Sequence, residues 1–302
     1  MIVQPSITPS VFSLLVFVSN VLGYGAGPAK EVSMNQESKV AVQLYVFGEA
    51  ARAPGAKFEG VLETVKRAGF SNVQGWLDLF DSEEDAQQLV ATLSKFGLRM
   101  PAAYHGGAMH TQEGADETLT LILRRAAIAK DHGLEIVVMN PDPIGREKTD
   151  EELALQSRNL NQLGARLREL GLRLAVHQHD PEMKSEAREW YHILHHTDDD
   201  KVFVCLDLHW VYRGGQDPYR LLRDAGKRTI DLHLRNSVDG VWAQDLGEGD
   251  IDYGRVEKIL DEIGYEGSLT VELAYEKGTK TTRALGANLG RSREFVRRTF
   301  GV

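Results

Sequence analysis

The chain has a single cysteine, no long hydrophobic run and no excess of positive charge. Cys205 cannot form a disulfide within one chain, and its apolar neighbours indicate a small buried side chain. The apolar run at residues 11–18 is shorter than the roughly 20 residues of a membrane-spanning helix, so we expect no stable membrane span. A net charge of −9 over 302 residues argues against nucleic-acid binding, because phosphates require a positive surface.

Charged side chains are also missing from the start of the chain. No Asp, Glu, Lys or Arg occurs before Lys30. The short apolar run followed by small residues is typical of a secretory signal, although the run has no Lys or Arg ahead of it. We therefore expect residues 1–29 to be either a signal peptide or a disordered extension. The corresponding location is periplasmic or secreted, with a cytoplasmic location as the alternative.

From residue 40 onward, short apolar runs alternate with longer segments of helical periodicity. The runs predict buried strands at 40–47, 72–77, 98–104, 134–140, 172–177, 202–207, 229–234 and 268–273. The longer segments predict helices near 57–69, 82–96, 113–132, 150–170, 185–196, 217–226, 253–264 and 279–299. Capping hydroxyls at Ser82 and Thr149 and a glycine after most helices support these boundaries.

Eight strand–helix units in one constant order predict a parallel sheet, and eight is the number that closes a barrel. An open doubly wound sheet is the alternative, but no Gly-x-Gly-x-x-Gly follows the first strand. We therefore predict an α/β chain with a single (β/α)₈ TIM barrel over residues 40–302, preceded by the short N-terminal extension.

In such a barrel the active site lies where the strands end. Polar residues gather at these positions: His105, Asn140, His177, His179, Asp207, His209, His233, Arg235 and Glu272. Each alone has a structural reading, such as a core histidine or a helix cap, but their joint placement favours a site. Imidazoles and carboxylates that converge on one cavity can bind a divalent ion such as Mn²⁺, Co²⁺, Zn²⁺ or Mg²⁺.

From about residue 40 to residue 300 the sequence resembles the xylose-isomerase-like barrels, the family of sugar phosphate isomerases and epimerases. The resemblance rests on four segments: Leu174–Asp180 (LAVHQHD), Cys205–His209 (CLDLH), Asp231–Arg235 (DLHLR) with Leu246–Tyr253 (LGEGDIDY), and Thr270–Ala274 (TVELA). The His-x-His-Asp form is similar to a branch that includes inosose dehydratase and keto-glycoside-processing enzymes.

The resemblance implies one divalent metal ion, Mn²⁺ in the first place and Co²⁺, Mg²⁺ or Zn²⁺ as alternatives. Asp207, His233 and Glu272 match three ligand positions of the family. The fourth ligand stays open between His177, His179 and Glu182, because epimerases of the family usually carry Glu where this chain has His177.

Such a site suits removal of a proton next to a carbonyl, through a metal-stabilised enediolate. We expect Glu272 to be the base, and His177 or His179 to be the second acid–base group. Substrate contacts are expected from residues at strand ends and in the following loops: His105, Asn140, Arg235, Trp242 and Glu248.

The expected function is that of a metal-dependent isomerase or epimerase of a sugar or keto-sugar. The alternative is a dehydratase or lyase acting on a keto-sugar, keto-glycoside or inosose, because an imidazole can protonate a leaving oxygen. An apurinic-site endonuclease and a non-catalytic sugar-binding barrel are remote alternatives. The expected partner is a small carbohydrate, and the resemblance favours a homodimer or homotetramer.

Overall fold

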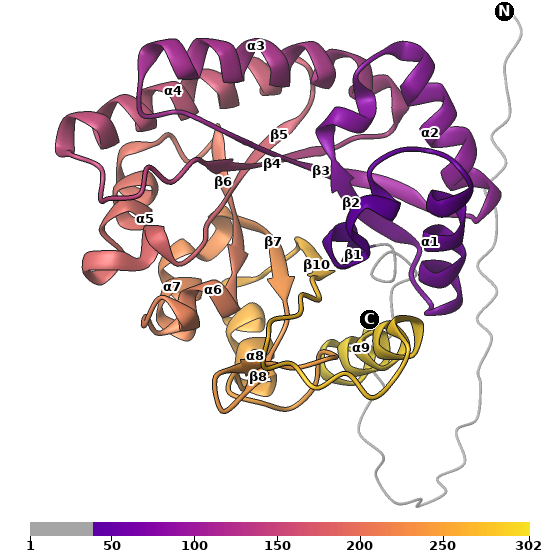
Figure 1. Cartoon of the computed structure of the whole chain (residues 1–302). Helices are drawn as coiled ribbons and strands as arrows, with labels where there is room; N and C mark the ends of the chain where they lie inside the picture. The colour runs from indigo at the N-terminus through magenta and orange to yellow at the C-terminus, as the bar shows by residue number, and fades with distance from the viewer. Residues whose placement is uncertain (1–38) are drawn as a thin grey trace, which may run out of the picture. The chain divides into compact units, whose positions relative to one another are not determined.

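The computed structural model describes residues 39–302, so the expected extension over residues 1–29 lies outside the described residues. Eight parallel strands close into a barrel in the order β1-β10-β7-β6-β5-β4-β3-β2 (Figure 1). The strands are β1 (Val40–Gln43), β2 (Asn72–Trp76), β3 (Arg99–Gly107), β4 (Ile136–Pro141), β5 (Arg173–His177), β6 (Val202–Asp207), β7 (Thr229–Leu234) and β10 (Ser268–Val271). The predicted TIM barrel is confirmed.

Helices surround the barrel on its outer side (Figure 1). They are α1 (Ala56–Arg67), α2 (Glu83–Lys95), α3 (Gln112–Ala129), α4 (Asp150–Glu169), α5 (Lys184–His196), α6 (Leu208–Arg213), α7 (Pro218–Ala225), α8 (Tyr253–Ile263) and α9 (Leu285–Phe300). Short 3₁₀ helices join them to the strands: η2 (Leu44–Ala51), η3 (Leu77–Phe80), η4 (Lys130–His132), η5 (Pro181–Met183) and η6 (Gly226–Arg228). Within residues 39–302, no helix is long and apolar enough to cross a membrane.

The helix ends follow the capping signals in the sequence. The Ser82 side chain accepts a hydrogen bond from the amide of Asp85, and Thr149 forms a reciprocal capping box with Glu152. Gly264 ends α8 in the left-handed conformation, with φ of 63°, which costs a residue without a Cβ little. These local signals explain why the strand–helix order could be predicted.

Three segments after strand ends differ from the sequence prediction, and the short helix α6 (Leu208–Arg213) was not predicted either. The first strand ends at Gln43, because the Gln43 side chain accepts the amide of Tyr45 and starts the 3₁₀ helix η2. The last helix begins at Leu285 instead of residue 279. After β7, an unpredicted two-stranded hairpin forms from β8 (Ser237–Val238) and β9 (Val241–Trp242). All three differences lie in loops that follow strand ends.

Beneath the polar strand ends, the barrel interior holds both apolar side chains and a hydrogen-bonded polar group of Gln74, Asp231 and Thr270. Small and aliphatic side chains form a separate buried cluster: Ala102, Ile136, Val138, Ala175, Cys205 and Ile230. Because side chains two residues apart share a side of a strand, His177 and Asp207 lie one layer above Ala175 and Cys205. Cys205 is fully buried and burial raises the pKa of its thiol, in agreement with the expected apolar role.

Candidate functional site

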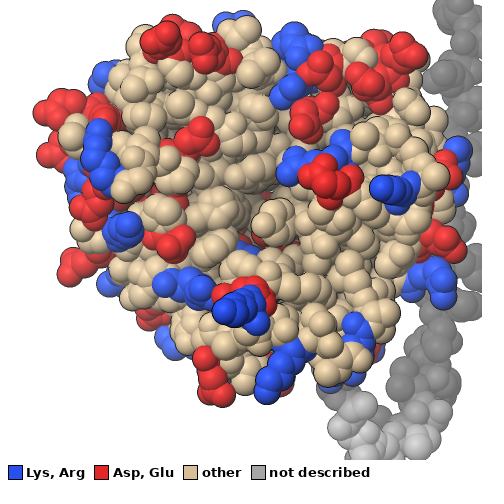
Figure 2. Space-filling model, viewed as in Figure 1, with Lys and Arg blue, Asp and Glu red and all other residues tan. Residues whose placement is uncertain are grey.

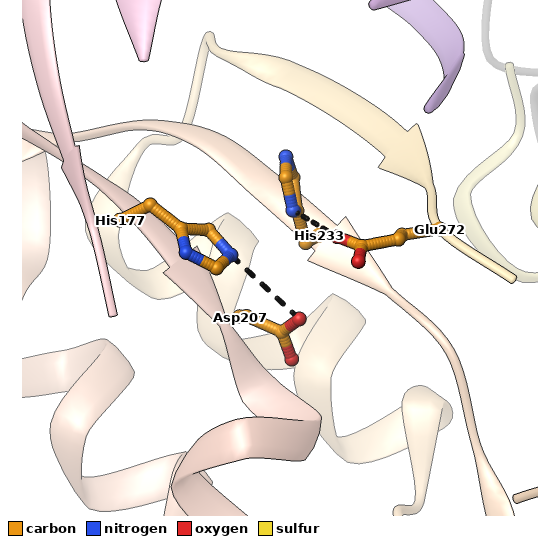
Figure 3. Close-up of side chains that lie close together, drawn as sticks. All are labelled: His177, Asp207, His233 and Glu272. Carbon is orange, nitrogen blue, oxygen red and sulfur yellow. Dashed lines mark ion pairs between the residues drawn. The ribbon is translucent and has the colours of Figure 1, made fainter. Parts of the chain in front are cut away.

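Four polar side chains from four neighbouring strands converge at the carboxyl end of the barrel. His177 ends β5, Asp207 ends β6, His233 lies on β7, and Glu272 follows β10 directly. Each offers one ligand atom, and these atoms all lie within 4.8 Å of one another (Figure 3). All four residues are buried. We call this group the four-residue cluster.

Two imidazole nitrogens in the cluster have no normal hydrogen bond. Within the described residues, His177 Nε2 and His233 Nδ1 are buried atoms without a partner of acceptable geometry. His177 Nε2 lies 3.8 Å from Asp207 Oδ2, and His233 Nδ1 lies 2.5 Å from Glu272 Oε2 (Figure 3). Two ring nitrogens and two carboxylates facing a common point are a donor set that fits a divalent ion such as Mn²⁺ or Zn²⁺.

A buried amide orients His233. Gln74 Nε2 donates a hydrogen bond to Asp231 Oδ2 at 2.8 Å, and Gln74 Oε1 lies 2.8 Å from His233 Nε2. Because the amide nitrogen of Gln74 donates to Asp231, its oxygen faces His233 and can only accept from the ring. His233 Nε2 therefore carries a hydrogen, and Nδ1 is the ring nitrogen that faces the cluster.

Asp207 is held by both of its oxygens. Oδ1 accepts the amides of His209 and Trp210 at 2.8 and 2.9 Å, which caps the N-terminus of α6. Oδ2 accepts a hydrogen bond from Arg235 at 2.9 Å. The helix-cap reading of Asp207 and its site reading are therefore compatible, because each uses a different oxygen.

The two carboxylates of the cluster are held in their ionised form. Burial would raise the pKa of Asp207, but the charge of Arg235 and the neighbouring imidazole of His177 outweigh it and hold the pKa well below its usual range. Burial likewise opposes ionisation of Glu272, but the charges of Arg235 and His233 bring its pKa down to about 2. Anionic oxygens are what a hard divalent cation requires.

The pKa values of the three histidines at the site are shifted in different directions. Burial lowers the pKa of His177, and burial together with the neighbouring His177 lowers that of His179 to about 3. For His233, burial acts in the same direction, but the carboxylate of Glu272 reverses the shift and raises the pKa. His177 and His179 are thus neutral near pH 7, with lone pairs available for a metal ion or a proton.

The cluster opens into a cavity of about 200 Å³. Figure 2 shows a hollow at the centre of this face, surrounded largely by uncharged side chains. The cavity is lined by Gln43, Tyr45, Arg52, Trp76, Tyr104, His177, His179, Trp210, His233, Arg235, Trp242 and Glu272. Arg235 is 3% exposed, and its guanidinium lies 4.7 and 4.6 Å from the ring centroids of Trp210 and Trp242, two rings that meet nearly at right angles with their centroids 5.5 Å apart.

The candidates for a fourth ligand lie in different places. His177 belongs to the four-residue cluster. His179 lines the cavity beside it, with ring centroids 4.7 Å apart, but lies outside the cluster. Glu182 lines a small pocket behind β5, and its Oε2 accepts the amide of His179 at 2.9 Å. Burial raises the pKa of Glu182 to about 7.

Three expected substrate contacts lie outside the cavity lining, whereas Arg235 and Trp242 lie within it. His105 follows Tyr104 on β3, and because Tyr104 faces the cavity, His105 faces the opposite side of the strand. Asn140 is buried behind His177, with its Oδ1 3.4 Å from His177 Nδ1. Glu248 lines a separate groove beside α9.

Sequence reasoning missed several residues around the site. Gln74 and Asp231 lie within strands, where a buried polar residue was the available signal. Tyr45 and Arg52 enter the cavity lining from the ends of η2, which the sequence analysis had assigned in part to a strand. Tyr45 and Arg52 reach the cavity because the chain turns into η2 after Gln43.

Comparison with known proteins gives the same fold and two kinds of relative. The model of the xylose isomerase-like TIM barrel family matches residues 62–299. Inosose dehydratase from Clostridium perfringens is 28% identical over 141 residues, which covers 41% of this chain and 48% of that protein. The chain thus matches about half the length of this curated relative.

Solved structures match over most of their length at low identity. A sugar phosphate isomerase/epimerase from Parabacteroides distasonis has a TM-score of 0.70 at 20% identity, covering 89% of this chain and 98% of that one. A 3-keto-D-glucoside 4-epimerase from E. coli has a TM-score of 0.65 at 15% identity, covering 85% and 99%. At such identities the likeness concerns the fold. The family match over residues 62–299 shows that this chain belongs to the xylose isomerase-like TIM barrel family.

Proposed function

We propose that the protein is a divalent-metal-dependent enzyme that isomerises or epimerises a keto-sugar by removing a proton next to its carbonyl. The observation that supports this most is the four-residue cluster, in which two carboxylates and two imidazoles place their ligand atoms within 4.8 Å of one another at the wall of a cavity. His177, Asp207, His233 and Glu272 would hold the ion, with Mn²⁺ as our first choice. A bound ion would act as a Lewis acid toward the oxygens of a ketone and a neighbouring hydroxyl.

The residues around the cluster supply the remaining functions. Glu272 lines the cavity in its ionised form, so it can accept the proton from carbon. His179 lines the same cavity and lies outside the four-residue cluster, which leaves its imidazole free to transfer a second proton. Arg235 presents a guanidinium to the substrate oxygens, held in place by Trp210 and Trp242.

Deuterium exchange tests the proposal directly. The metal-loaded protein is incubated in heavy water with a panel of ketoses, and deuterium gain is followed by mass spectrometry. We expect exchange at the carbon next to the carbonyl for at least one ketose, and loss of exchange in Glu272→Gln. Glu262→Gln is the matched control, because Glu262 forms an exposed ion pair with Arg223 on the outer surface. Full exchange by Glu272→Gln, or no exchange on any ketose or keto-glycoside, would contradict the proposal.

Elimination is the second candidate, as a dehydratase or lyase. A specific feature favours it: the end of β5 carries two imidazoles, His177 and His179, with ring centroids 4.7 Å apart. An imidazole that has accepted a proton from carbon can pass it to a leaving oxygen on the same face. The partial match to inosose dehydratases points the same way.

Product analysis separates the two reactions. Elimination releases water or an alcohol and leaves an unsaturated ketone, whereas epimerisation conserves the mass of the substrate. If His179 transfers the second proton, His179→Gln keeps the metal but loses turnover, whereas His177→Gln loses metal. His177→Glu would introduce at the end of β5 the carboxylate that epimerases of the family usually carry, in addition to Glu272. A gain of epimerisation in that variant would support elimination as the native reaction.

A further inference from the structure

A second chamber adjoins the catalytic cavity. It has a volume of about 350 Å³ and is lined by Tyr45, Val46, Gly48, Glu49, Arg52, Trp76, Ala274 and Tyr275. Tyr45, Arg52 and Trp76 also line the inner cavity of about 200 Å³, so the same three side chains border both spaces. We call the second space the outer chamber. The inner cavity alone is smaller than the roughly 300 Å³ at the low end of ligand sites, whereas the two together fall within that range.

Two tyrosines give the outer chamber flat, exposed faces. Tyr45 is 56% exposed and Tyr275 is 37% exposed, and both rings line the outer chamber. The Tyr275 ring is nevertheless held, because its hydroxyl donates to the carbonyl of Gln244 and accepts from Asn288 Nδ2, both at 3.1 Å. A ring fixed in this way can contact a ligand at a low cost in conformational entropy.

Polar groups stand beside these rings. The Arg52 guanidinium lies 3.6 Å from the centroid of Trp76, at the wall that both spaces share. The carboxylate of Glu49 lines the outer chamber as well. The lining of the outer chamber thus has one cation, Arg52, and one anion, Glu49, and lacks the excess of positive charge that would bind a phosphate. Both side chains can hydrogen-bond to hydroxyl groups.

We propose that the outer chamber binds the second sugar ring of a glycoside whose keto-sugar ring occupies the inner cavity. The substrate class is therefore a keto-sugar joined to another sugar, a keto-disaccharide, and not a free or phosphorylated monosaccharide. Tyr45 and Tyr275 would contact the apolar face of the second ring, while Arg52 and Glu49 bind its hydroxyls. The assignment of the inner ring rests on the proposed function, whereas binding of the second ring can be measured without turnover.

Calorimetric titration of the metal-loaded full chain tests this assignment. The probes are D-fructose, two disaccharides that carry fructose at the reducing end (lactulose and maltulose), and fructose 6-phosphate. We expect at least one disaccharide to bind about tenfold or more tightly than fructose, because its second ring gains contacts with two aromatic side chains. Equal or weaker binding of both disaccharides, or tightest binding of the phosphate ester, would overturn the proposal.

Variants then locate the effect. Tyr275 lines the outer chamber alone, so Tyr275→Ala should weaken disaccharide binding about three- to tenfold and leave fructose binding unchanged. Tyr275→Phe keeps the ring and should retain most of the binding. Leu121→Ala removes an exposed apolar side chain on α3, away from both spaces, and is the control. Equal weakening of both ligands by Tyr275→Ala would contradict a separate subsite.

Two further results keep this proposal distinct from the proposed function. An O-benzyl ether of fructose that keeps the free carbonyl and binds more tightly than both disaccharides, with Glu49→Gln having no effect, would show that an aromatic group occupies the outer chamber and would overturn the assignment. Selective disaccharide binding without deuterium exchange on any substrate would leave the outer chamber supported and remove the proposed reaction instead.

Discussion

His233 donates the hydrogen of Nε2 to Oε1 of Gln74 at 2.8 Å, and Gln74 in turn donates to Asp231. This chain of two hydrogen bonds fixes which ring nitrogen of His233 faces the cluster. Partners of this kind typically change metal affinity about 10–100-fold when they are removed, although they do not touch the ion.

We therefore expect Gln74→Leu to weaken metal binding about 10–100-fold, because His233 loses the acceptor that sets its tautomer. Competition with a fluorescent chelator measures the affinity. Asn159→Leu is the control, since it also removes a buried amide, which donates to the carbonyl of Met109. Unchanged affinity in Gln74→Leu, in a variant that is folded by circular dichroism, would show that Gln74 does not orient the ligand.

The metal centre itself can be tested by elemental analysis and calorimetry. We expect about one equivalent of divalent ion per chain and a melting temperature several degrees lower after chelation, because a ligand at 100 times its Kd stabilises by about 2.7 kcal/mol. His177→Gln should lower the metal content, whereas His195→Gln on the exposed end of α5 should not. The site would be refuted if the purified protein contained no divalent metal and its melting temperature did not change on addition of a chelator.

Metal binding should depend on pH through His233. Glu272 raises the pKa of this imidazole against the effect of burial, so part of the metal-free protein carries a proton on it near pH 7. A metal ion needs the neutral ring, so binding must release that proton, and the affinity should rise with pH until His233 is fully neutral. Glu272, with its pKa of about 2, stays ionised throughout this range.

Titration calorimetry at pH 7 in two buffers of different ionisation enthalpy counts the released protons. Proton release on metal binding is expected, and it should grow as the pH is lowered toward 6. Identical heats in both buffers, together with an affinity that does not change between pH 6 and 8, would contradict this prediction.

Arg235 contacts both the four-residue cluster and the aromatic lining of the cavity. It donates a 2.9 Å hydrogen bond to Asp207 and lies against the rings of Trp210 and Trp242. Arg235→Ala should lower the free energy of unfolding by about 3–5 kcal/mol, because a buried carboxylate loses its partner. Arg235→Lys should restore part of that stability but little activity, since an ammonium group lacks the flat guanidinium that contacts both rings.

Urea unfolding of the metal-free protein measures both variants. The exposed pair of Arg223 and Glu262 provides the comparison, and Arg223→Ala should cost no more than about 1 kcal/mol. If Arg235→Ala were as stable as Arg223→Ala, the buried pair of Arg235 and Asp207 would contribute no more to the free energy of unfolding than an exposed pair, which would contradict this prediction.

The barrel could be predicted from local signals. Capping hydroxyls such as Ser82 and Thr149, and glycines such as Gly264, mark helix ends through bonds within a few residues, and eight repeats of one unit leave few topologies. The convergence of Asp207, His233 and Glu272 followed from the same reasoning, because parallel strands in a closed barrel end on one face.

Sequence alone thus determined the barrel, the polar strand ends and the face on which they meet, since periodicity and capping act over short distances along the chain. Tertiary structure decided which side chains share a cavity. It placed His177 in the cluster and Glu182 behind β5, brought Gln74 from across the barrel to His233, and turned the chain after Gln43 so that Tyr45 and Arg52 line the cavity. These relationships depend on contacts between residues distant in sequence, and no local pattern encodes their distances.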